Sequence, residues 1–322
     1  MKIPFALHRK IPQIRRVLEQ RDQAIRDVAS LHEELARLRH RNEQLESLIA
    51  ERAKPQYPFL FGDADARMGE TAKRIWSLMR PMDVVGKRLI RMGRPHDGGY
   101  IMVDHALHGA IAYSLGINDD VSWDLDMAEL GCQIFQYDHT IAALPYEHPN
   151  FHWSKKGIAA RQSTDGTLDR LDDLIAQNGH SGRRDLILKM DIEGFEWEVF
   201  EAMEENTLQQ FSQIVLEVHS LVLGGAELQS RIANVLAKLY RYHQPVHVHA
   251  NNHGYLGIVG GVAMPDTMEL SYVRRADHQF TMCHRMFPSD FDTPCRIDVP
   301  DFYLGPLGAL PEVDLEERRI SD

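Results

Sequence analysis

The chain has 322 residues, of which 43% are hydrophobic and 26% charged, and its formal net charge is -11. This composition excludes a short disulfide-stapled protein and a disordered chain, because it supplies enough apolar residues for a proper core. The excess of 47 acidic over 36 basic residues argues against a nucleic-acid binder, since such proteins gain affinity by neutralising phosphates. Three cysteines without a CxxC pair, the lack of a signal-peptide core and the lack of about 20 consecutive apolar residues predict a cytoplasmic protein that does not span a membrane.

Residues 1–53 form the first unit, with 11 basic and 8 acidic residues and a seven-residue apolar repeat. The repeat places Val28 and Leu35 at positions a and Leu31 at d, which is typical of a coiled coil, and Asn42 at a fixes register. We expect a dimerisation stalk that forms a parallel homodimer, with a trimer as the alternative. A helix lying on its own globular domain would need a broader apolar stripe. The mixed apolar and basic start could also make a peripheral contact with the inner face of the membrane.

Pro55 and Pro58 predict the end of this helix, and residues 54–108 are assigned as a linker and lead-in segment. Residues 109–322 are expected to form an α/β domain with a parallel sheet, because predicted strands and helices alternate there. Two late strands over 246–250 and 268–273 suit an antiparallel pair. The other predicted strands are 109–115, 132–137, 151–159, 186–190 and 214–218, and the predicted helices are 121–130, 168–177, 195–203 and 228–240.

Ligands of open α/β sheets bind beyond the carboxyl ends of the strands, so residues that follow each strand are candidate site residues. Gly116 follows the first strand, where it permits close approach to a nucleoside, and Asp138 ends the second strand, where an acid can bind ribose hydroxyls. A dehydrogenase would require GxGxxG, of which this turn has only the first glycine. Asp119 and Asp120 would repel a pyrophosphate. A nucleoside with a cationic sulfur and no phosphate fits better.

A second group of candidates follows the fourth and fifth strands. Asp191 and His219 would lie close together if these strands are neighbours, and a histidine oriented by a carboxylate can act as a general base. Glu193 is either a site residue or an acid that stabilises a helix start, and Glu196 is better explained as the latter. Asp191, His219 and Glu217 could instead bind a divalent metal, but their spacing is no established metal motif, so we favour catalysis without a metal.

A polar cluster follows the strand over 246–250. These side chains are either half-buried strand residues or the donors and acceptors that the hydroxyls of a sugar need. The residues of this expected acceptor site are His249, Asn251, Asn252 and His253.

Residues 188–196, LKMDIEGFE, resemble the KxDxEGxE signature of FkbM-type methyltransferases, which use S-adenosylmethionine. Further segments that resemble this family occur in the expected order between residues 97 and 275: LGIN at 115–118, YD at 137–138, TLD at 167–169, LEVH at 216–219 and NN at 251–252. The resemblance implies a Rossmann-like seven-stranded methyltransferase sheet, although Asp138 replaces the more usual Glu and Asp120 stands where Gly is common. The expected cofactor-binding residues are Tyr100, Gly116, Asn118, Asp138 and Gly157.

The resemblance and the residues together predict an S-adenosylmethionine-dependent O-methyltransferase that acts on a sugar or glycan, for example in surface polysaccharide biosynthesis. His219, assisted by Asp191 and with Glu193 nearby, is expected to deprotonate the acceptor hydroxyl. The alternatives are an O-methyltransferase of a small secondary metabolite and a non-catalytic coiled-coil scaffold. The intact set of Gly116, Asp138, Asp191 and His219 argues against the scaffold.

Overall fold

The computed structural model divides the chain into two units, Met1–Gln56 and Tyr57–Asp322. It describes residues 66–222 and 225–312 and, in the first unit, a few isolated helical positions. The coiled coil predicted over residues 1–53 therefore falls outside the described residues except at those positions, and the dimer stays a prediction. The isolated positions are Arg16, Glu19, Gln20, Gln23, Val28, Leu31 and Leu35.

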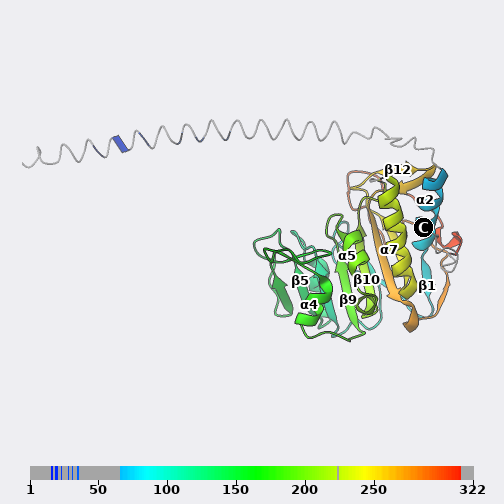
Figure 1. Cartoon of the computed structure of the whole chain (residues 1–322), viewed down its shortest axis with the longest axis horizontal. Helices are drawn as coiled ribbons and strands as arrows, with labels where there is room; N and C mark the ends of the chain where they lie inside the picture. The colour runs from blue at the N-terminus through cyan, green and yellow to red at the C-terminus, as the bar shows by residue number, and fades with distance from the viewer. Residues whose placement is uncertain are drawn as a thin grey trace, which may run out of the picture. The chain divides into compact units, whose positions relative to one another are not determined.

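A seven-stranded mixed sheet organises the second unit, in the order β11-β14-β10-β9-β4-β5-β6 (Figure 1). The five strands from β10 to β6 in this order run parallel, and β14 runs antiparallel to both β10 and β11. The predicted α/β sheet and the predicted antiparallel late pair are thus confirmed. The strands are β4 Ile111–Leu115, β5 Gln133–Tyr137, β6 Phe151–Ser154, β9 Leu186–Met190, β10 Phe211–Val218, β11 His243–Ala250 and β14 Met268–Arg274.

Side-chain alternation along the central strands creates two apolar layers. In β9, Leu186 and Leu188 point into one layer, whereas Ile187 points into the other. The first layer lies under helices α2, α4, α5 and α7 (Figure 1), and the second lies under α3 and a small hairpin. Burial on both faces explains why β9 reads as a continuous apolar run in the sequence. The helices are α2 Ala66–Leu78, α3 Ser122–Glu129, α4 Leu171–Gln177, α5 Glu196–Ala202, α6 Glu205–Leu208 and α7 Gly225–Tyr242.

The segment assigned as a linker and lead-in contains regular structure from Ala66 onward. Helix α2 packs against α7, and β2 and β3 form the antiparallel hairpin that covers the second layer. The strand β1 pairs with β15. The residues that follow β15, 283–312, are called the C-terminal segment below. The strands outside the main sheet are β1 Met82–Val84, β2 Leu89–Met92, β3 Tyr100–Val103, β12 Leu256–Val259, β13 Val262–Pro265 and β15 Phe280–Met282, and the short 3-10 helices are η1 Arg275–Asp277 and η2 Leu307–Ala309.

The strand predicted over residues 151–159 is divided in two. β6 ends at Ser154, and β7 Gly157–Ile158 leaves the main sheet to pair with β8 Leu168–Asp169. The following helix α4 starts at Leu171, later than predicted, because the preceding residues belong to β8. An ion pair between Lys156 and the buried Asp169 joins the two short strands.

In the part of the chain that the structure describes, no helix combines the length and the apolar character that crossing a bilayer requires.

Candidate active site

A cavity of about 870 Å³ lies beyond the carboxyl ends of β4, β5, β9 and β10. Its lining is strongly acidic, because eight carboxylate side chains face it together with only one arginine and one lysine. A cationic or neutral ligand therefore fits this cavity better than an anionic one. The charged lining residues are Asp97, Asp119, Asp120, Asp124, Asp138, Asp191, Glu193, Glu217, Arg94 and Lys189.

Gly116 makes the tight turn that leaves β4. Its φ of +78° is a conformation that favours glycine, and an added Cβ would lie 1.6 Å from the carbonyl oxygen of Asp191. The side chain of Lys189 donates a hydrogen bond of 2.7 Å to the Gly116 carbonyl. The turn is thus packed directly on the end of β9, and a glycine is required here for two separate reasons.

Asp138 lies at the cavity and holds the turn after Gly116. One of its oxygens accepts the backbone N–H groups of Ile117 and Asn118, both at 2.9 Å. The other oxygen accepts the backbone N–H and the hydroxyl of Thr140. Burial disfavours the charged carboxylate, but these hydrogen bonds outweigh burial and lower the pKa of Asp138. The residue predicted to bind ribose is therefore an ionised group that also fixes the shape of the loop.

Of the other residues predicted to bind the cofactor, two line the cavity and one does not. Asn118, with a φ of 50°, and Gly157 line the cavity, and a Cβ on Gly157 would lie 2.4 Å from a ring nitrogen of His139. Tyr100 is 2% exposed and lies behind the lining, with its ring centroid 5.8 Å from Nζ of Lys189. Tyr100 can thus affect the cavity through Lys189 rather than by contact with a ligand.

His219 lies between carboxylates on both sides of its ring. Its Nδ1 is 3.3 Å from Oε1 of Glu196, and its Nε2 is 3.1 Å from Oε1 of Glu217 and 3.7 Å from Oε2 of Glu193. Burial by itself would lower the pKa of His219, but the hydrogen bonds to Glu196 and Glu217 raise it to about 11. A pKa this far above neutrality favours the protonated ring, with Glu196 beside Nδ1 and Glu217 beside Nε2. A general base needs a free lone pair, which this protonation state does not offer.

Asp191 directly follows β9, and one of its oxygens lies within 4.8 Å of a ring nitrogen of His219. Burial raises the pKa of Asp191 to about 6, although the charges of Lys189 and His219 oppose this shift. Its Oδ1 is buried without a hydrogen-bond partner among the described residues. Burial also raises the pKa of Glu217, to about 8, and its second oxygen accepts a hydrogen bond of 3.0 Å from Asn251. Asp191 thus lines the cavity beside His219, with a pKa below that of Glu217.

Asp191, Glu217 and His219 also place one potential ligand atom each within 4.8 Å of one another. A metal held there would require a neutral His219 with a lone pair directed at the ion. Both ring nitrogens already contact carboxylates, so the residues fit an ion only after His219 loses a proton and turns. Catalysis without a metal at this point stays our prediction.

Glu196 is the site residue that sequence reasoning missed. It starts α5, as expected of a helix-start acid, but it is fully buried. Its carboxylate accepts the backbone N–H groups of Ile192 at 2.9 Å and of Gly194 at 3.0 Å, in addition to its contact with His219. It therefore braces the loop that carries Glu193, whose φ of 57° is unusual for a residue with a side chain. The second Glu of the EGxE segment is the available sequence signal.

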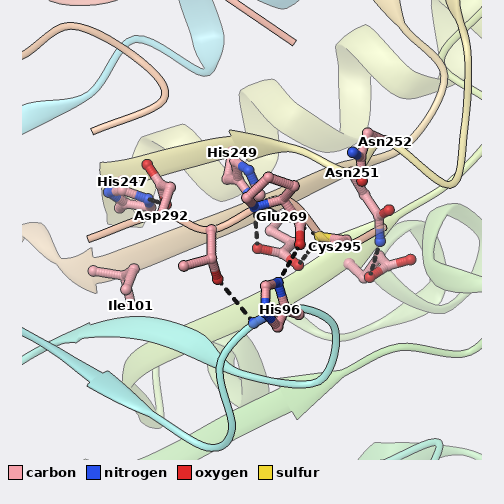
Figure 2. Close-up of polar contacts among 12 residues, drawn as sticks. His96, Ile101, His247, His249, Asn251, Asn252, Glu269, Asp292 and Cys295 are labelled. Atoms are coloured by element: carbon pink, nitrogen blue, oxygen red, sulfur yellow. Dashed lines mark hydrogen bonds and ion pairs between the residues drawn. The ribbon is translucent and has the colours of Figure 1, made fainter. Parts of the chain in front are cut away.

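The four residues predicted to bind the acceptor divide into two pairs. Asn251 and His253 line the cavity. His249 is 1% exposed and does not line the cavity; its ring contacts Glu269 (Figure 2) and Asp301 of the C-terminal segment. Asn252 donates to the backbone carbonyl of Arg296 at 3.0 Å and accepts its N–H at 2.6 Å. The structure therefore brings only Asn251 and His253 to the cavity. His249, on β11, and Asn252, just after β11, contact the C-terminal segment instead.

Residues 110–255 match the family model described as a methyltransferase FkbM domain. No curated protein matches the chain. A putative methyltransferase from an antibiotic biosynthesis pathway of Anabaena variabilis is similar at 12% identity with a TM-score of 0.27, covering 46% of this chain and 59% of that one, less than two thirds of its length. A putative S-adenosylmethionine dependent methyltransferase from Listeria monocytogenes is similar at 9% identity with a TM-score of 0.32, covering 53% and 92%. The family match falls on the strands and turns that build the cavity, so this part of the chain is similar to the methyltransferase domain of the FkbM family.

Proposed function

We propose that the protein is an S-adenosylmethionine-dependent O-methyltransferase that acts in the cytoplasm on a hydroxyl of a sugar or glycan. The observation that supports it most directly is the position of Asp191, which lines the cavity next to the Gly116 turn in the part of the chain that matches the FkbM domain. A base and a nucleoside-binding turn are needed at one place for this chemistry, and these two residues meet there.

The donor set of the cavity suits S-adenosylmethionine. The ligand carries a cationic sulfonium and no phosphate, and the acidic lining favours such a charge. Gly116, Asn118, Asp138 and Gly157 are the residues that would hold its nucleoside part. When bound, S-adenosylmethionine supplies a methyl group that is already activated for transfer.

The protein then has to position the acceptor oxygen and remove one proton. We assign the proton to the carboxylate of Asp191, because this residue lines the cavity and its pKa of about 6 leaves it ionised above that pH. His219, held as an imidazolium by Glu196 and Glu217, keeps positive charge beside Asp191 and maintains it as a carboxylate. In this mechanism His219 is a positioning residue, in place of the base predicted from the sequence.

Two features of the lining favour a sugar over a small aliphatic acceptor. Asn251 and His253 offer hydrogen-bonding groups for hydroxyls. Phe195 also lines the cavity and is 55% exposed, so its ring can pack against the apolar face of a sugar ring. Such an acceptor fits the synthesis of a glycan such as a surface polysaccharide.

The test is methyl transfer from S-adenosylmethionine to two matched panels of acceptors, neutral oligosaccharides and hydroxylated secondary metabolites. We expect mass spectrometry to detect the gain of one methyl group on an oligosaccharide, and at least a hundredfold less product in the same time with Asp191→Asn. Methylation confined to the second panel would reject the sugar acceptor and retain the reaction. Calorimetry that detects no binding of S-adenosylmethionine would reject methyl transfer and favour a scaffold.

A further inference from the structure

A second cluster of ligating side chains lies behind the cavity, outside the site described above. His249 of β11, Glu269 of β14 and Cys295 of the C-terminal segment meet there, and all three are buried (Figure 2). Nδ1 of His249 is 3.0 Å from Oε2 of Glu269, and Sγ of Cys295 is 3.2 Å from Oε1 of Glu269 and 3.9 Å from Nδ1 of His249. Three different donor types thus converge from three separate segments.

These separations are close to those of ligands around one zinc ion. Tetrahedral zinc binds sulfur at about 2.3 Å and nitrogen or oxygen at about 2.0–2.2 Å, so its ligand atoms lie about 3.3–3.6 Å apart. Nδ1 of His249 and Sγ of Cys295 are 3.9 Å apart, about 0.3 Å beyond this range, and each contacts a different oxygen of Glu269, at 3.0 and 3.2 Å. Small side-chain rotations are enough to place all three donors on one ion.

The outer contact of His249 is also one that metal-bound histidines make. Its Nε2 is 2.9 Å from Oδ2 of Asp301, which can accept the remaining ring proton while Nδ1 faces the cluster. A carboxylate on the far nitrogen fixes the tautomer of a histidine ligand and increases its basicity. Asp301 belongs to the same C-terminal segment as Cys295, so the segment supplies both a ligand and its support.

The charges around Glu269 give an independent reason for a cation. Glu269 is the direct antiparallel partner of Glu217, and like charges in this position repel each other across the strands. The carboxylate of Asp97 lies within 4.8 Å of both. A divalent ion at Glu269 would offset this repulsion.

We propose that His249, Glu269 and Cys295 bind one divalent transition-metal ion, zinc by its donor set, and that the ion fastens the C-terminal segment to β11 and β14. On binding, the Cys295 thiol loses its proton, Nδ1 of His249 is free of a proton and Nε2 keeps the one it donates to Asp301, so protons are released to solvent as the ion enters. None of the three ligands lines the cavity, and the role is structural.

The first test measures metal in the full chain, purified without chelators and then incubated with zinc and desalted. We expect about one zinc per chain by elemental mass spectrometry, and at least a tenfold lower content in Cys295→Ser and His249→Gln. Cys132→Ser is the matched control, because Cys132 is also buried and its thiol donates to the carbonyl of Leu107, a contact that serine can keep. The control should retain the wild-type zinc content.

The second test needs no substitution. Cobalt(II) added to the metal-free full chain should give the thiolate-to-cobalt charge-transfer absorption of a bound cysteine, and zinc should abolish this band and raise the melting temperature. A wild-type chain that neither retains zinc nor develops the thiolate band would overturn the proposal, and the cluster would be a hydrogen-bonded network only. A thiolate band that persists in Cys295→Ser would also overturn it, because another cysteine would then be the ligand.

Discussion

His219 and Asp191 illustrate how neighbours decide which of two candidate groups can accept a proton. The sequence places both at the ends of strands that are adjacent in the sheet, and β9 does pair with β10. It does not show that Glu196 and Glu217 hold both nitrogens of His219. These contacts raise the pKa of His219, which is why we propose Asp191 and not His219 as the base.

The pH dependence of the rate distinguishes the two residues. With Asp191 as base, kcat/KM should be constant above neutral pH and fall as pH decreases through about 6, because protonation removes the acceptor lone pair. Asp191→Asn should lower kcat by about a hundredfold to ten-thousandfold. A rate that instead keeps increasing with pH towards 11 would identify His219 as the base, since its pKa is near that value.

Glu196→Gln should reduce stability and lower the pKa of His219. The variant removes a buried charge that accepts backbone N–H groups and contacts the ring, and such losses cost about 1–3 kcal/mol. The folded pKa of His219 is above its unfolded value of about 6.5, so this pair stabilises the fold below that pH and the contribution disappears as pH rises towards 11.

Denaturant unfolding and NMR titration of His219 measure the two effects of Glu196→Gln. Glu198→Gln is the matched control on the same helix, because Glu198 is half exposed and contacts Arg231 at 3.6 Å on the surface. A control that loses as much stability as Glu196→Gln would contradict the bracing role. An unchanged pKa of His219 would contradict the electrostatic one.

The turn after β4 is the element that packs the loop held by Asp138 against the end of β9. Gly116→Ala should destabilise the protein by more than the roughly 1–2 kcal/mol that a side chain costs in a left-handed conformation, because its Cβ would also collide with the Asp191 carbonyl. Gly166→Ala separates the two effects, since Gly166 has a φ of +75° but no atom within 4 Å of the added Cβ. If both variants lose the same unfolding free energy, the backbone around Gly116 shifts enough to avoid the collision, and the prediction is wrong.

Elements with a strong local pattern were predictable, and elements defined by long-range contacts were not. The apolar run of β9 and the family-like turns identify the sheet and its ligand-binding edge. The contact of Glu196 with His219 joins residues that are 23 positions apart and depends on the pairing of β9 with β10, and the local sequence around Glu196 does not show it. His249 and Asn252 were predicted to bind the acceptor, but they contact the C-terminal segment. The sequence could not separate these two roles, because both use the same polar side chains.

At the scale of the whole molecule, the prediction concerns the oligomeric state. We expect residues 1–53 to join two chains as a parallel dimer. Among the described positions of the first unit, Val28, Leu31 and Leu35 are helical and exposed at 51%, 64% and 46% in the single chain. These are a and d positions of the repeat, and apolar side chains in those positions are stabilised when a second helix covers them. A dimer would place two active sites on one stalk, which suits an acceptor with repeated units through multivalent binding.

Light scattering on the full chain should therefore give the mass of a dimer, and deletion of residues 1–53 should reduce it to that of one chain. Leu31→Glu combined with Leu38→Glu tests the same seam without removing it, because two buried charges at d positions would face their own copies in the partner. Glu33→Lys, at a position off the a and d seam, is the control and should leave the dimer intact. If both the deletion and the double substitution keep the full-chain oligomer, the association belongs to the methyltransferase domains and the stalk has another role.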